Sequence, residues 1–127
     1  MERETLRIML SAILTRVARV EFRGLENLPP EGGLIVATNH MSRADTLLLF
    51  INPARKDITA LVADKYQKIP FFNWVLRTGG VIWSDRGKAD FTAFRLAADV
   101  LKSGVALGIA PEGTRSSTGK LQEGKPG

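Results

Sequence analysis

The chain has 127 residues, of which 44% are apolar, a composition typical of one globular domain. It contains no cysteine and one histidine, which excludes disulfides, a cysteine nucleophile and a metal site built from several histidines. Eighteen basic residues against thirteen acidic ones give a net charge of +5 and a pI near 10.0, which favours anionic partners such as nucleic acid, anionic lipid headgroups or phosphorylated metabolites.

The first segment, residues 2–18, is predicted to form a helix, because apolar residues recur at spacings of three and four. The stripe consists of Leu6, Met9, Leu10, Ile13, Leu14 and Val17. Arginines flank it, so the helix could lie in a membrane interface or pack on its own domain. No apolar run approaches the roughly 20 residues of a membrane span, and no signal-peptide cleavage pattern follows.

The next segments alternate between strand and helix patterns. Residues 19–23 alternate in polarity and predict a short edge strand, and the prolines and glycines of 24–33 predict a loop. The continuous apolar run 34–39 is typical of a strand buried on both faces. A helix over 43–52 and a strand over 58–63 follow.

The second half repeats this alternation. We expect a short helix over 68–80, a strand over 81–84, a helix over 87–103 and a last strand over 105–110. Four residues share one face of the longer helix: Phe91, Phe94, Ala98 and Leu101.

This order predicts an α/β domain, with a mostly parallel or mixed sheet flanked by helices. Residues 1–20 would form the amphipathic helix and residues 21–127 the domain. Polar residues follow three of the strands, as "NH", "DR" and "PEGTR". Ligands of such sheets bind beyond the carboxyl ends of the strands, so the three clusters are expected to converge.

The first cluster contains the only histidine, His40, five positions before Asp45. In a continuous helix the two side chains would lie about 140° apart. A turn capped by Ser42 would bring them together, and the carboxylate could then orient the imidazole as a base. The same residues also fit a capping box with a purely structural role, and this stretch does not decide between the two.

The second cluster, "PEGTRSSTGK" at 111–120, supplies groups suited to holding a phosphate. Gly113 permits close backbone approach, Thr114 offers a hydroxyl and Arg115 a guanidinium. It is not a P-loop, because five residues rather than four separate Gly113 from Gly119. A simple polar turn is the alternative.

Two further cations follow strands: Lys65 follows 58–63, and Arg86 follows 81–84. Each could neutralise a phosphate or could simply be solvated. The aromatic-rich segment 69–83 could line an acyl-chain path or belong to the core.

Four stretches together resemble the glycerolipid acyltransferases, the family that includes 1-acylglycerol-3-phosphate acyltransferase. "NHMSRAD" is similar to its Asn-His-x4-Asp block, "GGVIWSDR" to its second block and "PEGTRS" to its third. "ADKYQKIPFF" resembles the segment between the first two blocks. The resemblance covers roughly residues 24–127.

The resemblance implies transfer of a fatty acyl group from acyl-CoA or acyl-carrier protein to a hydroxyl of 1-acylglycerol 3-phosphate. His40 would be the general base and Asp45 would orient it, without an acyl-enzyme, metal or cofactor. The acceptor site would be shaped by Glu112, Gly113, Thr114 and Arg115, and its phosphate bound by Arg115 with Lys65 and Arg86.

The resemblance also implies a peripheral or monotopic location on the cytoplasmic face of the cell membrane, with residues 1–20 in the interface. Family members continue with a further block, so these residues are similar to a C-terminally truncated member. The rival function is a basic lipid- or phosphate-binding module without catalysis. Nucleic-acid binding is not expected, because no basic helix with interleaved aromatics is present.

Overall fold

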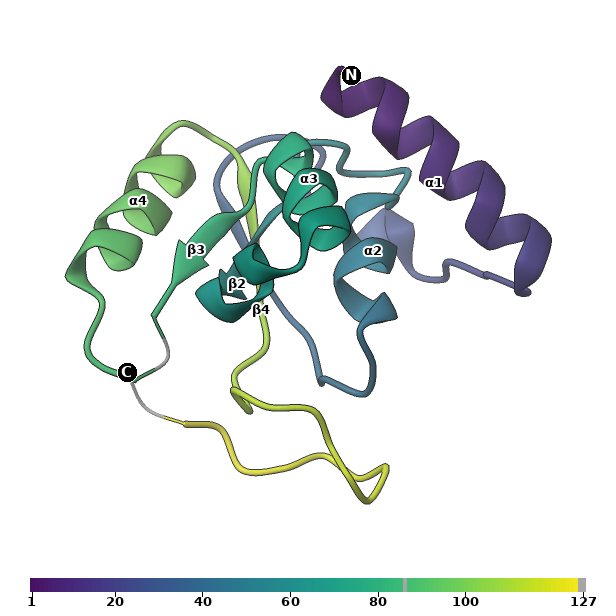
Figure 1. Ribbon diagram of the computed structural model, residues 1–127. Coiled ribbons are helices and arrows are strands. Elements are labelled where there is room, and N and C mark those ends of the chain that lie inside the picture. Colours follow the sequence, from purple (N-terminus) through teal and green to yellow (C-terminus); the bar gives the residue numbers. More distant parts are fainter. Residues whose placement is uncertain (86, 126–127) are drawn as a thin grey trace.

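The computed structural model describes residues 1–85 and 87–125 (Figure 1). Its centre is a four-stranded sheet in the order β1-β4-β2-β3, and every neighbouring pair is parallel. The strands are β1 (Leu34–Ala37), β2 (Thr59–Ala63), β3 (Ile82–Ser84) and β4 (Ala106–Ile109). The α/β architecture predicted from the sequence is confirmed, and the sheet is wholly parallel.

Helices cover both faces of the sheet (Figure 1). They are α1 (Arg3–Val17), α2 (Ala44–Phe50), α3 (Pro70–Gly79) and α4 (Phe91–Lys102), with 3-10 turns η1 (Leu25–Asn27) and η2 (Asp64–Lys68). The first three helices lie on one side of the sheet and α4 on the other. Among the described residues, no helix combines the length and the apolar character needed to cross a membrane.

The core follows this layering. A cluster of Leu6, Phe50, Ile51 and Val75 joins α1, α2 and α3. On the opposite face a second cluster joins α4 to β3 and β4, and it consists of Ile82, Ala93, Ala97 and Leu107. Leu6 is fully buried, so α1 packs on the domain through part of its predicted stripe.

The edge strand predicted over residues 19–23 is not formed. This segment is irregular, and Phe22 packs against the cluster of α1, α2 and α3. An alternating pattern produces a strand only where a neighbouring strand edge is in reach, and here one aromatic side chain is buried against helices instead.

The prediction that the strand at 34–39 is buried on both faces is also wrong. β1 lies at an edge of the sheet, and Ile35 is 53% exposed. Its register opposite Leu107 places Ile35 on the α4 side, where α4 packs on β3 and β4 and leaves β1 uncovered. A continuous apolar run does not by itself encode the position of a strand in its sheet.

Helix α4 begins four residues later than predicted, because Asp90 caps it by accepting from the N–H of Ala93. Its buried side is formed by alanines, which allow close approach to the sheet. Phe91 and Phe94, grouped on one face by the sequence, are 81% and 75% exposed.

An ion pair between a buried arginine and a partly exposed aspartate joins the loops at the amino ends of the strands. Arg55 is 2% exposed and donates to Asp57 and to the carbonyls of Pro29, Gly32 and Gly104. The Arg55 guanidinium lowers the pKa of Asp57 to about 2.

Candidate active site

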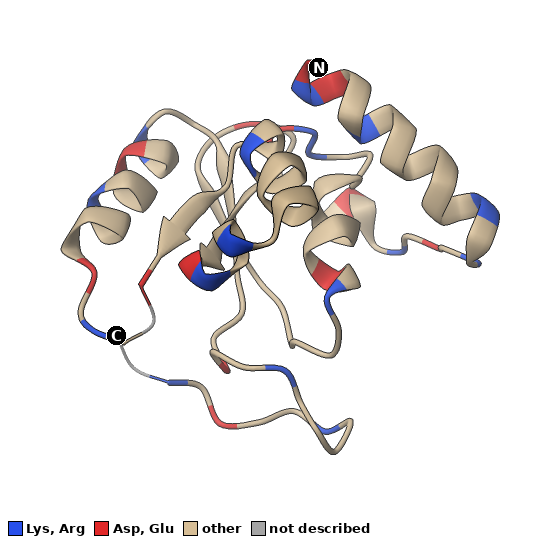
Figure 2. Ribbon diagram, in the orientation of Figure 1, with Lys and Arg blue, Asp and Glu red and all other residues tan. Residues whose placement is uncertain are grey.

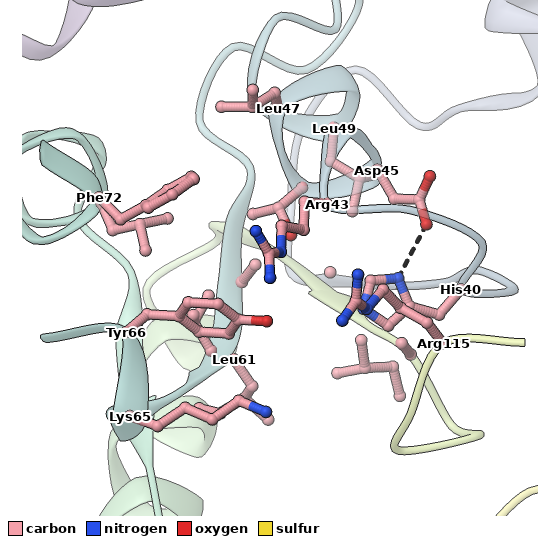
Figure 3. A pocket seen from close by; sticks show the side chains of 18 of the residues that line it. His40, Arg43, Asp45, Leu47, Leu49, Leu61, Lys65, Tyr66, Phe72 and Arg115 are labelled. Atoms are coloured by element: carbon pink, nitrogen blue, oxygen red, sulfur yellow. Dashed lines mark hydrogen bonds and ion pairs between the residues drawn. The ribbon is translucent and has the colours of Figure 1, made fainter. Parts of the chain in front are cut away.

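All three polar clusters contribute residues to one cavity of about 390 Å³ at the carboxyl ends of the strands: His40 from the first, Asp85 from the second, and Gly113, Thr114 and Arg115 from the third (Figure 3). One part of its lining is polar and carries charges of both signs: His40, Arg43, Lys65, Tyr66 and Arg115, with the carboxylates of Asp45, Asp64 and Asp85. The other part is apolar and comes from α1, α2, α3 and β2: Leu10, Leu47, Leu49, Leu61, Phe72, Val75 and Leu76. The cavity is therefore amphipathic.

His40 and Asp45 meet across the turn between β1 and α2. His40 Nδ1 lies 2.8 Å from Asp45 Oδ2, which also accepts from the N–H groups of Met41 (2.7 Å) and Ser42 (2.9 Å). Ser42 Oγ in turn accepts from the N–H of Ala44. The capping pattern and the His-Asp pair are thus both present, and the capped turn brings the pair together.

The environment of Asp45 determines which nitrogen of the His40 imidazole carries the proton. Partial burial opposes ionisation of Asp45, but hydrogen bonds from Ser42, His40 and Met41 outweigh it and lower the pKa of this carboxyl. An ionised carboxylate can only accept a hydrogen bond, so Nδ1 carries the proton and Nε2 of the neutral ring carries a lone pair. The His40 side chain is 25% exposed and opens on the cavity.

Glu112 is placed differently from the other predicted residues. It is 3% exposed and is absent from the cavity lining. Its Oε1 accepts from the N–H of His40 (3.1 Å) and its Oε2 from the N–H of Gln122 (2.8 Å). Ser116 also donates its N–H to the carbonyl of His40 (2.7 Å). The "PEGTRS" segment therefore holds the backbone of the histidine.

The remaining predicted residues face the cavity where they are described. Gly113, at φ 69°, turns the chain after β4, and Thr114 and Arg115 follow it along the cavity wall. Arg115 lines the same cavity as His40, and the Lys65 ammonium points toward this space from η2 (Figure 3). Arg86 lies outside the described residues.

Residues 19–127 match the family model described as Acyltransferase. The chain belongs to the Acyltransferase family.

Named relatives agree with this assignment. The chain is 34% identical over 106 residues to a 1-acyl-sn-glycerol-3-phosphate acyltransferase of Borreliella burgdorferi, covering 82% of this chain and 42% of the relative. It is 34% identical over 116 residues to the Pseudomonas aeruginosa enzyme of the same name, covering 85% and 43%. The chain thus spans less than half the length of these curated relatives.

A solved structure gives the same result. The 1-acyl-sn-glycerophosphate acyltransferase PlsC of Thermotoga maritima superposes with a TM-score of 0.73 at 29% identity. The match covers 97% of this chain and 48% of that one. The resemblance to glycerolipid acyltransferases inferred from the sequence motifs is confirmed.

Arg43, Tyr66 and Gly108 also line the cavity and were not predicted from the sequence. Arg43 and Tyr66 point their polar groups into the cavity (Figure 3), and Gly108 of β4 lines it. A Cβ at Gly108 would lie 2.9 Å from Leu49 Cδ1, so the glycine leaves room for α2. Sequence features could have indicated two of these residues: Arg43 is a cation between His40 and Asp45, and Gly108 is a glycine inside a strand, where close approach of another element is common.

Proposed function

We propose that the protein transfers a fatty acyl group from acyl-CoA or acyl-carrier protein to the free hydroxyl of 1-acylglycerol 3-phosphate. The observation that carries the proposal is the His40–Asp45 pair, which opens on a cavity that is polar and supplies three cations on one side and is apolar on the other. An amphiphile with a phosphate and an acyl chain matches both sides.

The reaction needs one base. His40 Nε2 takes the proton of the acceptor hydroxyl while the oxygen attacks the thioester carbonyl carbon. The tetrahedral intermediate collapses, the C–S bond breaks, and the thiolate leaves with the proton returned from His40. Asp45 stabilises the transient imidazolium. Such general-base catalysis contributes roughly 10²- to 10⁴-fold, and because the thioester is already activated, no cofactor is required.

Lys65 and Arg115 support binding of the acceptor phosphate, because both face the cavity within the same space as His40. Arg86 is proposed for the same role from the sequence alone. The leucines and phenylalanines of the opposite wall would hold an acyl chain.

The test is release of CoA from acyl-CoA, measured with a thiol reagent, when full-length protein is given 1-acylglycerol 3-phosphate. We expect release that depends on the acceptor, a loss of at least about 100-fold in His40→Ala, and a comparable loss in Asp45→Asn. Lys102→Ala, an exposed change on α4, serves as the control. Acceptor binding without any His40-dependent release would instead support the non-catalytic binding module.

We further propose that the protein works at the cytoplasmic face of a membrane, bound peripherally through α1. The middle of this helix carries no charge, and its charged residues gather at its two ends (Figure 2). Ile8 and Ile13 are 57% and 50% exposed, while Leu10 lines the cavity. An interfacial α1 would place the bilayer next to the site that its lipid substrate must enter.

Flotation with liposomes that contain anionic lipid tests this surface. Replacing both Ile13 and Val17 by Asn should weaken binding about tenfold or more without loss of fold, since both side chains are exposed (50% and 75%) and share one face of α1. Replacing Phe91 and Phe94 of α4, which are 81% and 75% exposed, by Asn in one protein is the control. Equal losses in both proteins would contradict a role specific to α1.

A further inference from the structure

Arg43 is a free cation aimed into the cavity. It stands between His40 and Asp45 in sequence, and the turn that joins these two residues directs its guanidinium toward Tyr66 and the cavity centre (Figure 3). Within residues 1–85 and 87–125 it takes part in no ion pair. The neighbouring carboxylate, Asp45, is already occupied by His40 and two backbone N–H groups.

The buried arginines of this chain have protein partners. Arg55 and Arg7 are paired with Asp57 and Glu4. Arg43 is exposed and lines the cavity, and within residues 1–85 and 87–125 its guanidinium makes no ion pair, so it can bind a ligand that enters there.

Two other cations share this space. Lys65 reaches it from the turn after β2, over the ring of Tyr66 at 5.4 Å, and Arg115 reaches it from the turn after β4. Besides Asp45, two carboxylates line the cavity, Asp64 and Asp85. Asp45 and Asp85 are engaged by other groups of the chain, Asp85 by the N–H of Gly87 and by Lys88, so the three cations face Asp64 as the remaining carboxylate of the lining.

We propose that Arg43 binds the acceptor phosphate and, with Lys65 and Arg115, selects a phosphomonoester over a phosphodiester headgroup; the inference rests on the proposed function. A monoester dianion presents three terminal oxygens, and three cations from three different turns can each bind one. A phosphodiester carries one negative charge and two terminal oxygens. The second ester group of its headgroup would occupy the position of the third terminal oxygen. Arg43 is thus a specificity-determining residue.

The experiment compares Arg43→Gln with the wild-type full-length protein on two acceptors of equal acyl chain, 1-acylglycerol 3-phosphate and lysophosphatidylglycerol. We expect the KM for the monoester to rise about 10- to 100-fold, the loss of one charge-assisted hydrogen bond, with little change in kcat. The preference for the monoester should fall by a similar factor, and the KM for acyl-CoA should stay unchanged. Arg43→Lys keeps the positive charge but loses the planar guanidinium with its paired N–H donors. Its preference for the monoester should lie between those of the wild type and Arg43→Gln.

Arg95→Gln, an exposed change on α4, is the matched control and should behave as wild type. A rise in the KM for acyl-CoA alone would overturn the inference by assigning Arg43 to the donor. An unchanged acceptor preference in both Arg43 variants would also overturn it. Absence of acceptor-dependent release in the wild type would instead reject the proposed function itself.

Discussion

Glu112 holds the backbone of the turn that carries His40. Its carboxylate is 3% exposed and accepts two backbone N–H groups, one of them that of His40, 72 positions earlier in the chain. Both oxygens are used in this way, and neither reaches the cavity lining. At the scale of single residues, the acid of "PEGTRS" is therefore best explained as a positioning residue, while Arg115 of the same motif faces the proposed substrate.

Glu112→Gln tests this assignment. The amide can accept at one oxygen, but its NH2 group would face a backbone N–H, so one buried donor is left unpaired at a cost of about 1–3 kcal/mol. We expect that loss of stability in urea unfolding, together with a fall in kcat larger than any rise in acceptor KM. The exposed Glu123→Gln is the control. Unchanged stability with a raised acceptor KM would show direct substrate binding instead.

At the scale of elements, the C-terminal end of α4 lies very close to the backbone just before β1. Gly33 precedes β1, and a Cβ there would lie 2.2 Å from the carbonyl oxygen of Leu101 in α4. Gly79, the last residue of α3, is different, because its added Cβ would make an ordinary contact of 3.5 Å with the Phe50 ring. Neither glycine has a positive φ, so the difference is purely steric.

The same substitution should therefore act with opposite sign at the two sites. Gly33→Ala forces two backbone segments apart and should destabilise the fold by about 3 kcal/mol. Gly79→Ala should be neutral or stabilise it by up to about 1 kcal/mol, because alanine favours helix. Urea unfolding midpoints measure both. Equal effects would show that the approach of α4 to β1 is not tight.

At the scale of the whole molecule, the Arg55–Asp57 pair joins loops that are distant in sequence. Asp57 also accepts from the N–H of Ala106, so the pair links the loop before β2 to the start of β4. Its depressed pKa means that the ionised carboxylate stabilises the fold above the ordinary pKa of 3.8 and that this contribution is lost as the pH falls from 3.8 toward 2.

Asp57→Asn should accordingly lower the thermal unfolding temperature clearly at pH 7 and by less at pH 3, and the difference from wild type should approach zero near pH 2. The exposed Asp99→Asn on α4 is the reference for the general effect of acid on this basic chain. A difference that stays constant from pH 7 to pH 3 would contradict the pKa assignment.

Several features of the protein follow from local sequence alone. Apolar periodicity and glycine or proline signals located four helices and four strands to within a few residues, and their alternation predicted the α/β sheet. Polar residues at strand ends predicted that the clusters of His40, Asp85 and Arg115 share one site, since the carboxyl ends of parallel strands lie at one edge of the sheet. The capped turn at Ser42 predicted the His40–Asp45 contact, because capping is a local interaction.

Tertiary structure decided the rest. The sequence shows that Phe91 and Ile35 are apolar, but their exposure depends on which element packs on which face of the sheet. The roles of Glu112 and Arg43 depend likewise on what lies opposite them: backbone N–H groups from another segment in one case, an open cavity in the other. Periodicity and capping act between neighbours in sequence, whereas burial and pairing are set by residues that come together only when the sheet is assembled.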